Sequence, residues 1–220
     1  EIDGYRLNNA EEIDTPAFLV YEDLVQHNID EIIRICGSAE RVVTHAKTHK
    51  SSDVLKLQMA KGLRSFKCAT LREAEMLAEN GGDEIIIAYP MLPPKKLQRF
   101  VALRRQYPNI DIKAIVSTPE HLKGLSEALG ANGLSLDVYI DLDTGMRRTG
   151  AQPGEEAGAL YVKAAATPAL NVLGVHIFDG QTLYKPDHAE RKELVDRSIE
   201  HMRDVWDYAG AHGLEVVDNV

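Results

Sequence analysis

Residues 41–50, with the sequence RVVTHAKTHK, carry two histidines and two lysines in their last six positions. The β-branched residues before them predict a short strand that ends at this basic tip. Such a strand would hold a lysine amine at a fixed place, and low-dielectric surroundings with a second cation nearby would favour its reactive, uncharged form. This chemistry suits a lysine that bonds to a carbonyl carbon. Taken alone, these ten residues are better explained as a solvated basic turn after a strand, and only the rest of the chain favours the catalytic interpretation.

Other residues that could do chemistry follow further apolar runs. They are His45, Lys47 and His49, then Cys68 and Thr70, then Tyr89, then the segment 141–150 (DLDTGMRRTG), and finally His176, Phe178, Asp179, Gly180 and Gln181. If the runs are parallel strands of a barrel, their carboxyl ends meet at one mouth. A lysine, two arginines and aromatic groups gathered there would suit an anionic aromatic ligand. An aldehyde cofactor such as pyridoxal phosphate fits this set.

Several of these residues also have a purely structural explanation. Arg147 and Arg148 could be solvated residues of an ordinary turn between two glycines. His176 lies in an apolar run, which favours a hydrogen-bonded core histidine over a catalytic base. Asp141 and Asp143 alternate along a strand and so share a face, but a carboxylate pair alone is weak evidence for acid–base catalysis.

The metal and redox chemistry that the sequence predicts is limited. His45 and His49 have no carboxylate or third ligand nearby in the sequence, so no metal site is predicted from them. Cys36 and Cys68 form no disulfide framework, and their helix-like and strand-like surroundings indicate buried, reduced thiols.

The apolar periodicity predicts the elements that must position these residues. In the first helix, Asp23 is the expected N-cap and Gly37 the expected stop. Helices are predicted at 23–37, 52–61, 71–80, 93–107, 119–129, 154–166 and 187–211. Strands are predicted at 17–20, from 42 into the basic tip, and at 65–70, 85–88, 112–117, 136–141, 172–178 and 214–217.

From residue 42 onward, seven predicted strands alternate with helices, which indicates an α/β fold with a parallel sheet. An open dinucleotide-binding sheet would need a glycine-rich turn after its first strand, whereas residues 45–50 (HAKTHK) contain no glycine. A (β/α)8 TIM barrel is therefore favoured. An eighth strand is missing from the 220 residues, and such barrels usually need about 250 residues, so we expect a barrel truncated after strand seven.

The composition excludes several classes of protein. A net charge of −9 argues against nucleic-acid binding, which rests on clustered lysine and arginine. The chain has no run of about 18 apolar residues that could span a membrane, and its acidic start does not resemble a signal peptide. A cytoplasmic protein with no membrane partner is expected.

Residues 45–50 (HAKTHK) resemble the lysine motif of the D-threonine aldolase and D-serine dehydratase family, in the alanine-racemase-like, fold-type III class of pyridoxal-phosphate enzymes. The resemblance extends along nearly the whole chain, through 14–16 (DTP), 69–70 (AT), 73–75 (EAE) and 88–90 (AYP). Residues 143–150 (DTGMRRTG) are similar to a segment found across the wider class. The lysine motif is the specific signal, and the second segment assigns only the class.

The resemblance implies roles for three residues. Lys47 would carry pyridoxal 5'-phosphate covalently through its amine, and Arg148 would approach the phenolic oxygen of the cofactor. Phe178 stands where family members often have a tyrosine that faces the pyridine. This is a departure from the family, because phenylalanine can stack on the ring but cannot hydrogen-bond its nitrogen.

The resemblance further implies an activity and alternatives to it. The first expectation is an aldolase that cleaves D-β-hydroxy-α-amino acids, of the D-threonine type, to glycine and an aldehyde. The alternatives are a D-serine or D-hydroxyaspartate dehydratase, an amino-acid racemase, and a non-catalytic pyridoxal-phosphate carrier barrel. A small D-amino acid is the expected substrate and a homodimer the expected assembly.

The family also has a glycine-rich phosphate loop, a last barrel strand and a C-terminal β-domain that carries metal ligands. None of these is found in the sequence. We therefore expect residues 1–220 to be the N-terminal cofactor-binding barrel domain of a longer protein, with a divalent metal bound outside this sequence. Expressed alone, the domain is expected to be poorly soluble and to bind the cofactor weakly.

Overall fold

The computed structural model describes residues 7–220. Its strands form one parallel sheet in sequential order. They are β1 (Val43–His45), β2 (Ser65–Cys68), β3 (Glu84–Ile87), β4 (Asp111–Val116), β5 (Leu136–Leu142), β6 (Leu170–Ile177) and β7 (Asp218–Asn219). The helices are α1 (Glu22–Cys36), α2 (Ser52–Ala60), α3 (Leu71–Glu79), α4 (Pro94–Gln106), α5 (Pro119–Gly130), α6 (Glu155–Ala165) and α7 (His188–Ala211). Short 3-10 helices lie at η1 (Ala10–Glu12), η2 (Ala39–Arg41), η3 (Ala46–Thr48) and η4 (Gly180–Thr182).

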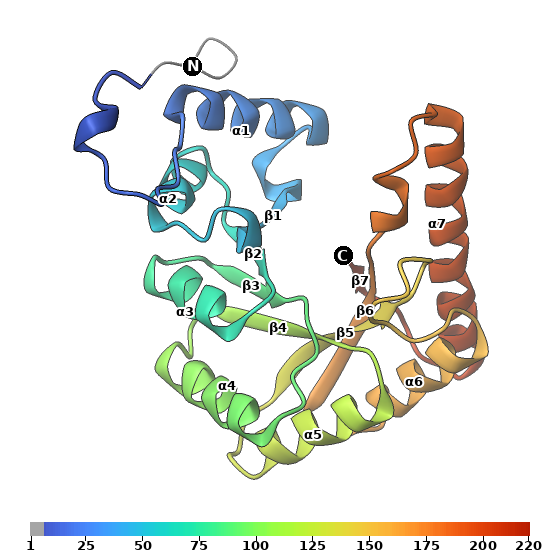
Figure 1. Ribbon diagram of the computed structural model, residues 1–220. Helices are drawn as coiled ribbons and strands as arrows, with labels where there is room; N and C mark the ends of the chain where they lie inside the picture. The colour runs from blue at the N-terminus through green and yellow to red at the C-terminus, as the bar shows by residue number, and fades with distance from the viewer. Residues whose placement is uncertain (1–6) are drawn as a thin grey trace.

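The sheet is curled, and the helices lie in an arc along its outer side from α1 round to α7 (Figure 1). Each of the strands β1 to β6 is followed by a helix before its parallel neighbour begins. The strict alternation predicted from the sequence is thus confirmed, and the molecule is a seven-stranded, curled half-barrel. Residues 7–220 contain no helix with the length and apolar character that a bilayer crossing requires.

The two faces of the sheet differ in chemistry. The outer face supplies the strand residues of the hydrophobic core, among them Phe66, Ile85 and Ile140. The alternate residues face inward, because successive side chains of a strand point to opposite faces. This inner face carries charged and polar groups beside Ile86 and Ile115, namely Lys67, Lys113, Asp141 and His176. An interior of this kind is unusual, since barrel interiors are dominated by Val, Ile and Leu.

Two of the element predictions near the amino-terminal end are wrong. Residues 17–20 form no strand, and the side chain of Phe18 is 75% exposed. An apolar run cannot show whether a partner strand lies beside it, and a strand exists only where its backbone finds one. The N-cap of α1 is Tyr21, and Asp23 lies within the first turn instead.

The seventh strand was predicted at 214–217 but lies at Asp218–Asn219. Gly174 explains the shift, because a Cβ there would lie 1.5 Å from the carbonyl oxygen of Asp218. The backbone of β7 therefore approaches β6 where β6 lacks a side chain, with Gly174 opposite Asp218. Leu214 and Val216 pack against the core as part of the connection from α7.

Candidate active site

Lys47 lies in the 3-10 turn η3, directly after strand β1 ends at His45. The backbone N–H of Lys47 donates to Nδ1 of His45 over 3.3 Å, and the N–H of Lys50 donates to the carbonyl of Ala46 over 2.9 Å. These bonds fix the turn at the end of the strand. The side chain of Lys47 is exposed rather than enclosed in the low-dielectric setting that the sequence suggested.

The structure brings the three predicted site residues together at the carboxyl ends of the strands. The Nζ atom of Lys47 lies 5.4 Å from the centroid of the Phe178 ring. The guanidinium carbon of Arg148 lies 4.8 Å from the same centroid. Both distances are within the range of a cation–π interaction. An amine, a guanidinium group and an aromatic ring from three separate segments therefore form one cluster.

The loop that carries Arg148 is held by its own side chains. One carboxylate oxygen of Asp143 accepts from the N–H groups of Gly145 and Arg147 over 3.0 and 2.8 Å. The hydroxyl of Thr144 donates to the carbonyl of Phe178 over 3.1 Å and so holds the loop against the residue that follows strand β6. Asp143 thus fixes the conformation of this loop. Asp141, the other carboxylate of the predicted pair, is buried and bonds to His176 instead.

The Phe178 ring depends on Gly180 for its place. A Cβ at Gly180 would lie 2.4 Å from the Phe178 ring and 3.2 Å from the sulfur of Met146. Any side chain there would push the ring away from its two cations. The glycine therefore serves the packing of the cluster.

A buried polar group lies on the inner face, two residues before Phe178. Nδ1 of His176 donates to Asp141 over 2.6 Å, and the hydroxyl of Ser117 donates to the other carboxylate oxygen over 3.0 Å. Burial lowers the pKa of His176 although the Asp141 bond opposes the shift, so the ring is neutral at pH 7. The prediction that His176 is a hydrogen-bonded core histidine is confirmed.

Lys67 also lies on the inner face near Asp141, although the sequence patterns did not mark it as a site residue. Phe66 and Cys68, its neighbours on β2, are completely buried in the core, so the side chain of Lys67 takes the inner face. Burial lowers the pKa of Lys67 to about 8; Asp141 opposes this shift, and Lys47 adds to it. Alternation of apolar and polar residues along 65–68 (SFKC) was the available signal.

His45 precedes Lys47 by two residues and contacts its backbone. Burial, together with the positive charges of Lys47 and Lys67, lowers the pKa of His45 to about 4. The ring is therefore neutral at pH 7, as an acceptor of the Lys47 N–H must be.

The second lysine of the motif, Lys50, has a different partner. Its Nζ lies 3.5 Å from a carboxylate oxygen of Glu73, whose side chain is only 4% exposed. The other oxygen of Glu73 accepts from the N–H of Ala69 over 2.8 Å, at the beginning of α3. Burial by itself would raise the pKa of Glu73, but this hydrogen bond, Thr70 and Lys50 together lower it.

The remaining sequence candidates do not join the cluster as reactive groups. Both cysteines are free, as predicted. Cys68 is completely buried, which raises the pKa of its thiol, whereas Cys36 is only half-buried, contrary to the prediction. Gln181 donates to Ser198 of α7 over 3.4 Å. Within residues 7–220, no three His, Cys, Asp or Glu side chains are grouped so as to hold a metal ion.

The structure also predicts a pH dependence of stability at His121. Its Nε2 accepts from the N–H of Met91 over 3.1 Å, and burial lowers its pKa from 6.5 to about 4, with Asp141 opposing slightly. Between these values the unfolded chain binds a proton that the folded chain does not, so stability should fall as the pH drops from 6.5 to 4. The loss should reach about 3 kcal/mol at most. Urea unfolding at several pH values measures it.

The variant His121→Gln serves as the comparison for this prediction. Its side-chain oxygen can still accept from Met91 N–H but does not titrate, so the slope of stability against pH should be smaller. An unchanged slope would assign the acid sensitivity to other buried histidines.

The chain resembles known proteins over nearly its whole length. Residues 20–217 match the family of the alanine racemase N-terminal domain. The 3-hydroxy-D-aspartate aldolase of Paracoccus denitrificans is 27% identical, over 92% of this chain and 52% of that protein. The D-threo-3-hydroxyaspartate dehydratase of Delftia sp. is 31% identical, over 76% of this chain and 41% of that protein. The crystal structure of D-threonine aldolase from Filomicrobium marinum matches with a TM-score of 0.83 and 27% identity, over 94% of this chain and 55% of that one.

Two facts follow from these comparisons. The chain spans about half the length of the curated relatives it matches. With nine-tenths of its residues covered by the family model, and with a parallel half-barrel whose first strand leads to Lys47, the chain belongs to the alanine racemase N-terminal domain family.

Proposed function

We propose that this chain is the barrel part of a pyridoxal-phosphate-dependent lyase that cleaves D-β-hydroxy-α-amino acids to glycine and an aldehyde. The observation that carries the proposal is the cluster at the strand ends, where the Lys47 amine and the Arg148 guanidinium lie over one Phe178 ring. Two of the compared proteins bear the names 3-hydroxy-D-aspartate aldolase and D-threonine aldolase, and their substrates are of this class.

The residues of the cluster fit the chemistry of the cofactor. Its aldehyde needs an amine, which Lys47 supplies, and its phenolic oxygen needs a cationic donor, which Arg148 supplies. The Phe178 ring offers an aromatic face for a pyridine but no hydrogen bond to the ring nitrogen. When bound, pyridoxal phosphate supplies an electron sink for the pair of electrons released when the Cα–Cβ bond breaks.

The inner face of the sheet adds groups that can handle protons near this cluster. Lys67 on β2 is a second amine near the cluster, and its pKa, lowered to about 8, lies close to neutral pH. The neutral imidazole of His176 donates from Nδ1 to Asp141, so its Nε2 is the nitrogen that can accept a proton. Both residues lie on the inner face of the sheet, and Lys67 is close enough to Lys47 for the two positive charges to interact.

A dehydratase is the second candidate, because the 31% identical relative bears that name. Product analysis with the whole chain, pyridoxal phosphate, D-threonine and D-threo-3-hydroxyaspartate, with and without a divalent metal ion, separates the possibilities. We expect glycine and an aldehyde. A keto acid with ammonia would indicate the dehydratase, the other enantiomer a racemase, and cofactor binding without product a carrier.

Arg148 should matter much more for cofactor binding than Arg147. Both arginines line a surface hollow with Arg197 and His201, but it is the guanidinium of Arg148 that lies over Phe178, whereas Arg147 adopts a positive φ of 55°. Arg148→Ala should weaken binding of pyridoxal phosphate by about tenfold, the value of one charge-assisted hydrogen bond. Spectrophotometric titration measures this, with Arg147→Ala as the matched control. Equal effects of the two variants would contradict the arrangement of the loop.

A further inference from the structure

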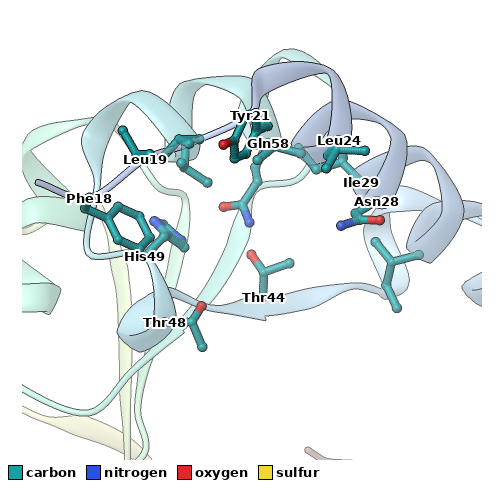
Figure 2. A pocket seen from close by; sticks show the side chains of 14 residues that line it. Phe18, Leu19, Tyr21, Leu24, Asn28, Ile29, Thr44, Thr48, His49 and Gln58 are labelled. Atoms are coloured by element: carbon teal, nitrogen blue, oxygen red, sulfur yellow. The ribbon is translucent and has the colours of Figure 1, made fainter. Parts of the chain in front are cut away.

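A cavity lies behind strand β1, between α1, α2 and the segment 18–21, and is distinct from the Lys47 cluster (Figure 2). Its volume is about 460 Å³. Thr44 lies at its floor, one residue before the inward-facing His45, so the cavity is on the outer face of the sheet. Most of its wall is apolar, contributed by Phe18, Leu24, Val25, Ile29, Ile32 and Val54.

Three polar atoms in this apolar wall are buried and have no hydrogen-bond partner. They are Oγ1 of Thr44, Nε2 of His49 and Oε1 of Gln58, and all three residues line the same cavity. Figure 2 shows the ends of the Gln58 and Thr44 side chains facing each other across it. Buried polar atoms are almost always hydrogen-bonded in folded proteins, so three unsatisfied ones in one cavity require an explanation.

The hydrogen-bond roles of these atoms can be assigned. Nδ1 of His49 accepts from the N–H of Ser51 over 3.1 Å. Burial lowers the pKa of His49, so its ring is neutral at pH 7 and carries its single proton on Nε2. The cavity therefore offers an N–H donor from His49, a carbonyl acceptor from Gln58 and a hydroxyl from Thr44 that can do either.

We propose that this cavity is a binding site for a small uncharged ligand that has an apolar body and a carboxamide group. The carbonyl oxygen of the ligand would accept from Nε2–H of His49, and its N–H would donate to Oε1 of Gln58. No Lys or Arg lines the cavity among the described residues. A carboxylate would therefore be buried without a counter-charge, which disfavours an acidic ligand of the same shape.

This site is independent of the function proposed for the Lys47 cluster. The two sites meet at the turn η3. Lys47 belongs to this turn, and Thr48 and His49 at its end line the cavity. A ligand that occupies the cavity would restrain the turn from its outer side.

Binding of benzamide, toluene and benzoate to the whole chain tests the proposal, by calorimetry and by NMR of the 15N-labelled histidine rings. Benzamide should bind about tenfold more tightly than toluene, because only its amide pairs with the polar atoms. It should also shift the Nε2 signal of His49, which toluene should leave in place. Gln58→Leu should remove part of the roughly tenfold advantage of benzamide over toluene, since only the bond to His49 remains, and the control Gln26→Leu, outside the cavity, should change neither affinity.

Several outcomes would overturn the proposal. They are equal affinities for benzamide and toluene, no binding of either, tighter binding of benzoate, or an unchanged Nε2 signal of His49 in the presence of benzamide. The last measurement uses the unaltered chain, so it decides the question even if Gln58→Leu does not fold.

Discussion

Borohydride reduction of the chain with pyridoxal phosphate should leave the pyridoxyl group on Lys47. The Nζ atom of Lys47 lies over Phe178 beside Arg148, where an aromatic anion can be held against the amine. The amine of Lys50 lies 3.5 Å from Glu73 and is held as its counter-ion. Peptide mapping by mass spectrometry locates the label. Lys47→Ala should reduce labelling to background, a loss of at least about a hundredfold in the specific adduct, because no second amine replaces one that reacts covalently.

Two controls make this result specific. Lys50→Ala should retain the label, since it removes an amine that pairs with Glu73. Lys67 is the more serious competitor, because its pKa of about 8 leaves more of its amine uncharged at neutral pH than an ordinary lysine has. A label on Lys67 would move the reactive centre onto the inner face of β2, and a label on Lys50 would contradict the placement of the turn.

Asp141→Ala should cost about 3 kcal/mol of the free energy of unfolding. The carboxylate is 2% exposed and accepts from His176 over 2.6 Å and from Ser117 over 3.0 Å. Its removal leaves two buried donors unsatisfied and takes away the negative charge that favours the protonated form of Lys67. Urea unfolding at pH 7 measures the loss.

The neighbouring carboxylate provides the matched control. Asp143→Ala removes hydrogen bonds in a solvent-accessible loop and should cost about 1 kcal/mol. Asp141→Asn, which keeps the shape and one acceptor, should fall between the two. A loss at Asp141 no larger than that at Asp143 would mean that the buried group contributes little, and that the interior tolerates an apolar replacement.

Much of this architecture follows from local patterns in the sequence. The helix bounds match closely, because apolar periodicity, the prolines at 94 and 119 and the glycine after α1 act within a few residues. The grouping of Lys47, Arg148 and Phe178 could be expected for a related reason. Parallel strands bring their carboxyl ends to one edge, so residues that follow strands must meet there once the alternation of strands and helices is recognised.

Other features depend on contacts between residues far apart in the chain. Asp141 meets His176 across 35 positions, and the polar inner face emerges only when the sheet is assembled. The seventh strand lies where Gly174 admits the backbone of Asp218, which no pattern within 214–217 could indicate. The cavity behind β1 combines α1, β1 and α2. Periodicity tells which residues of an element are buried, whereas the partner of each polar atom is decided by which elements pack together, and that is settled only in the tertiary structure.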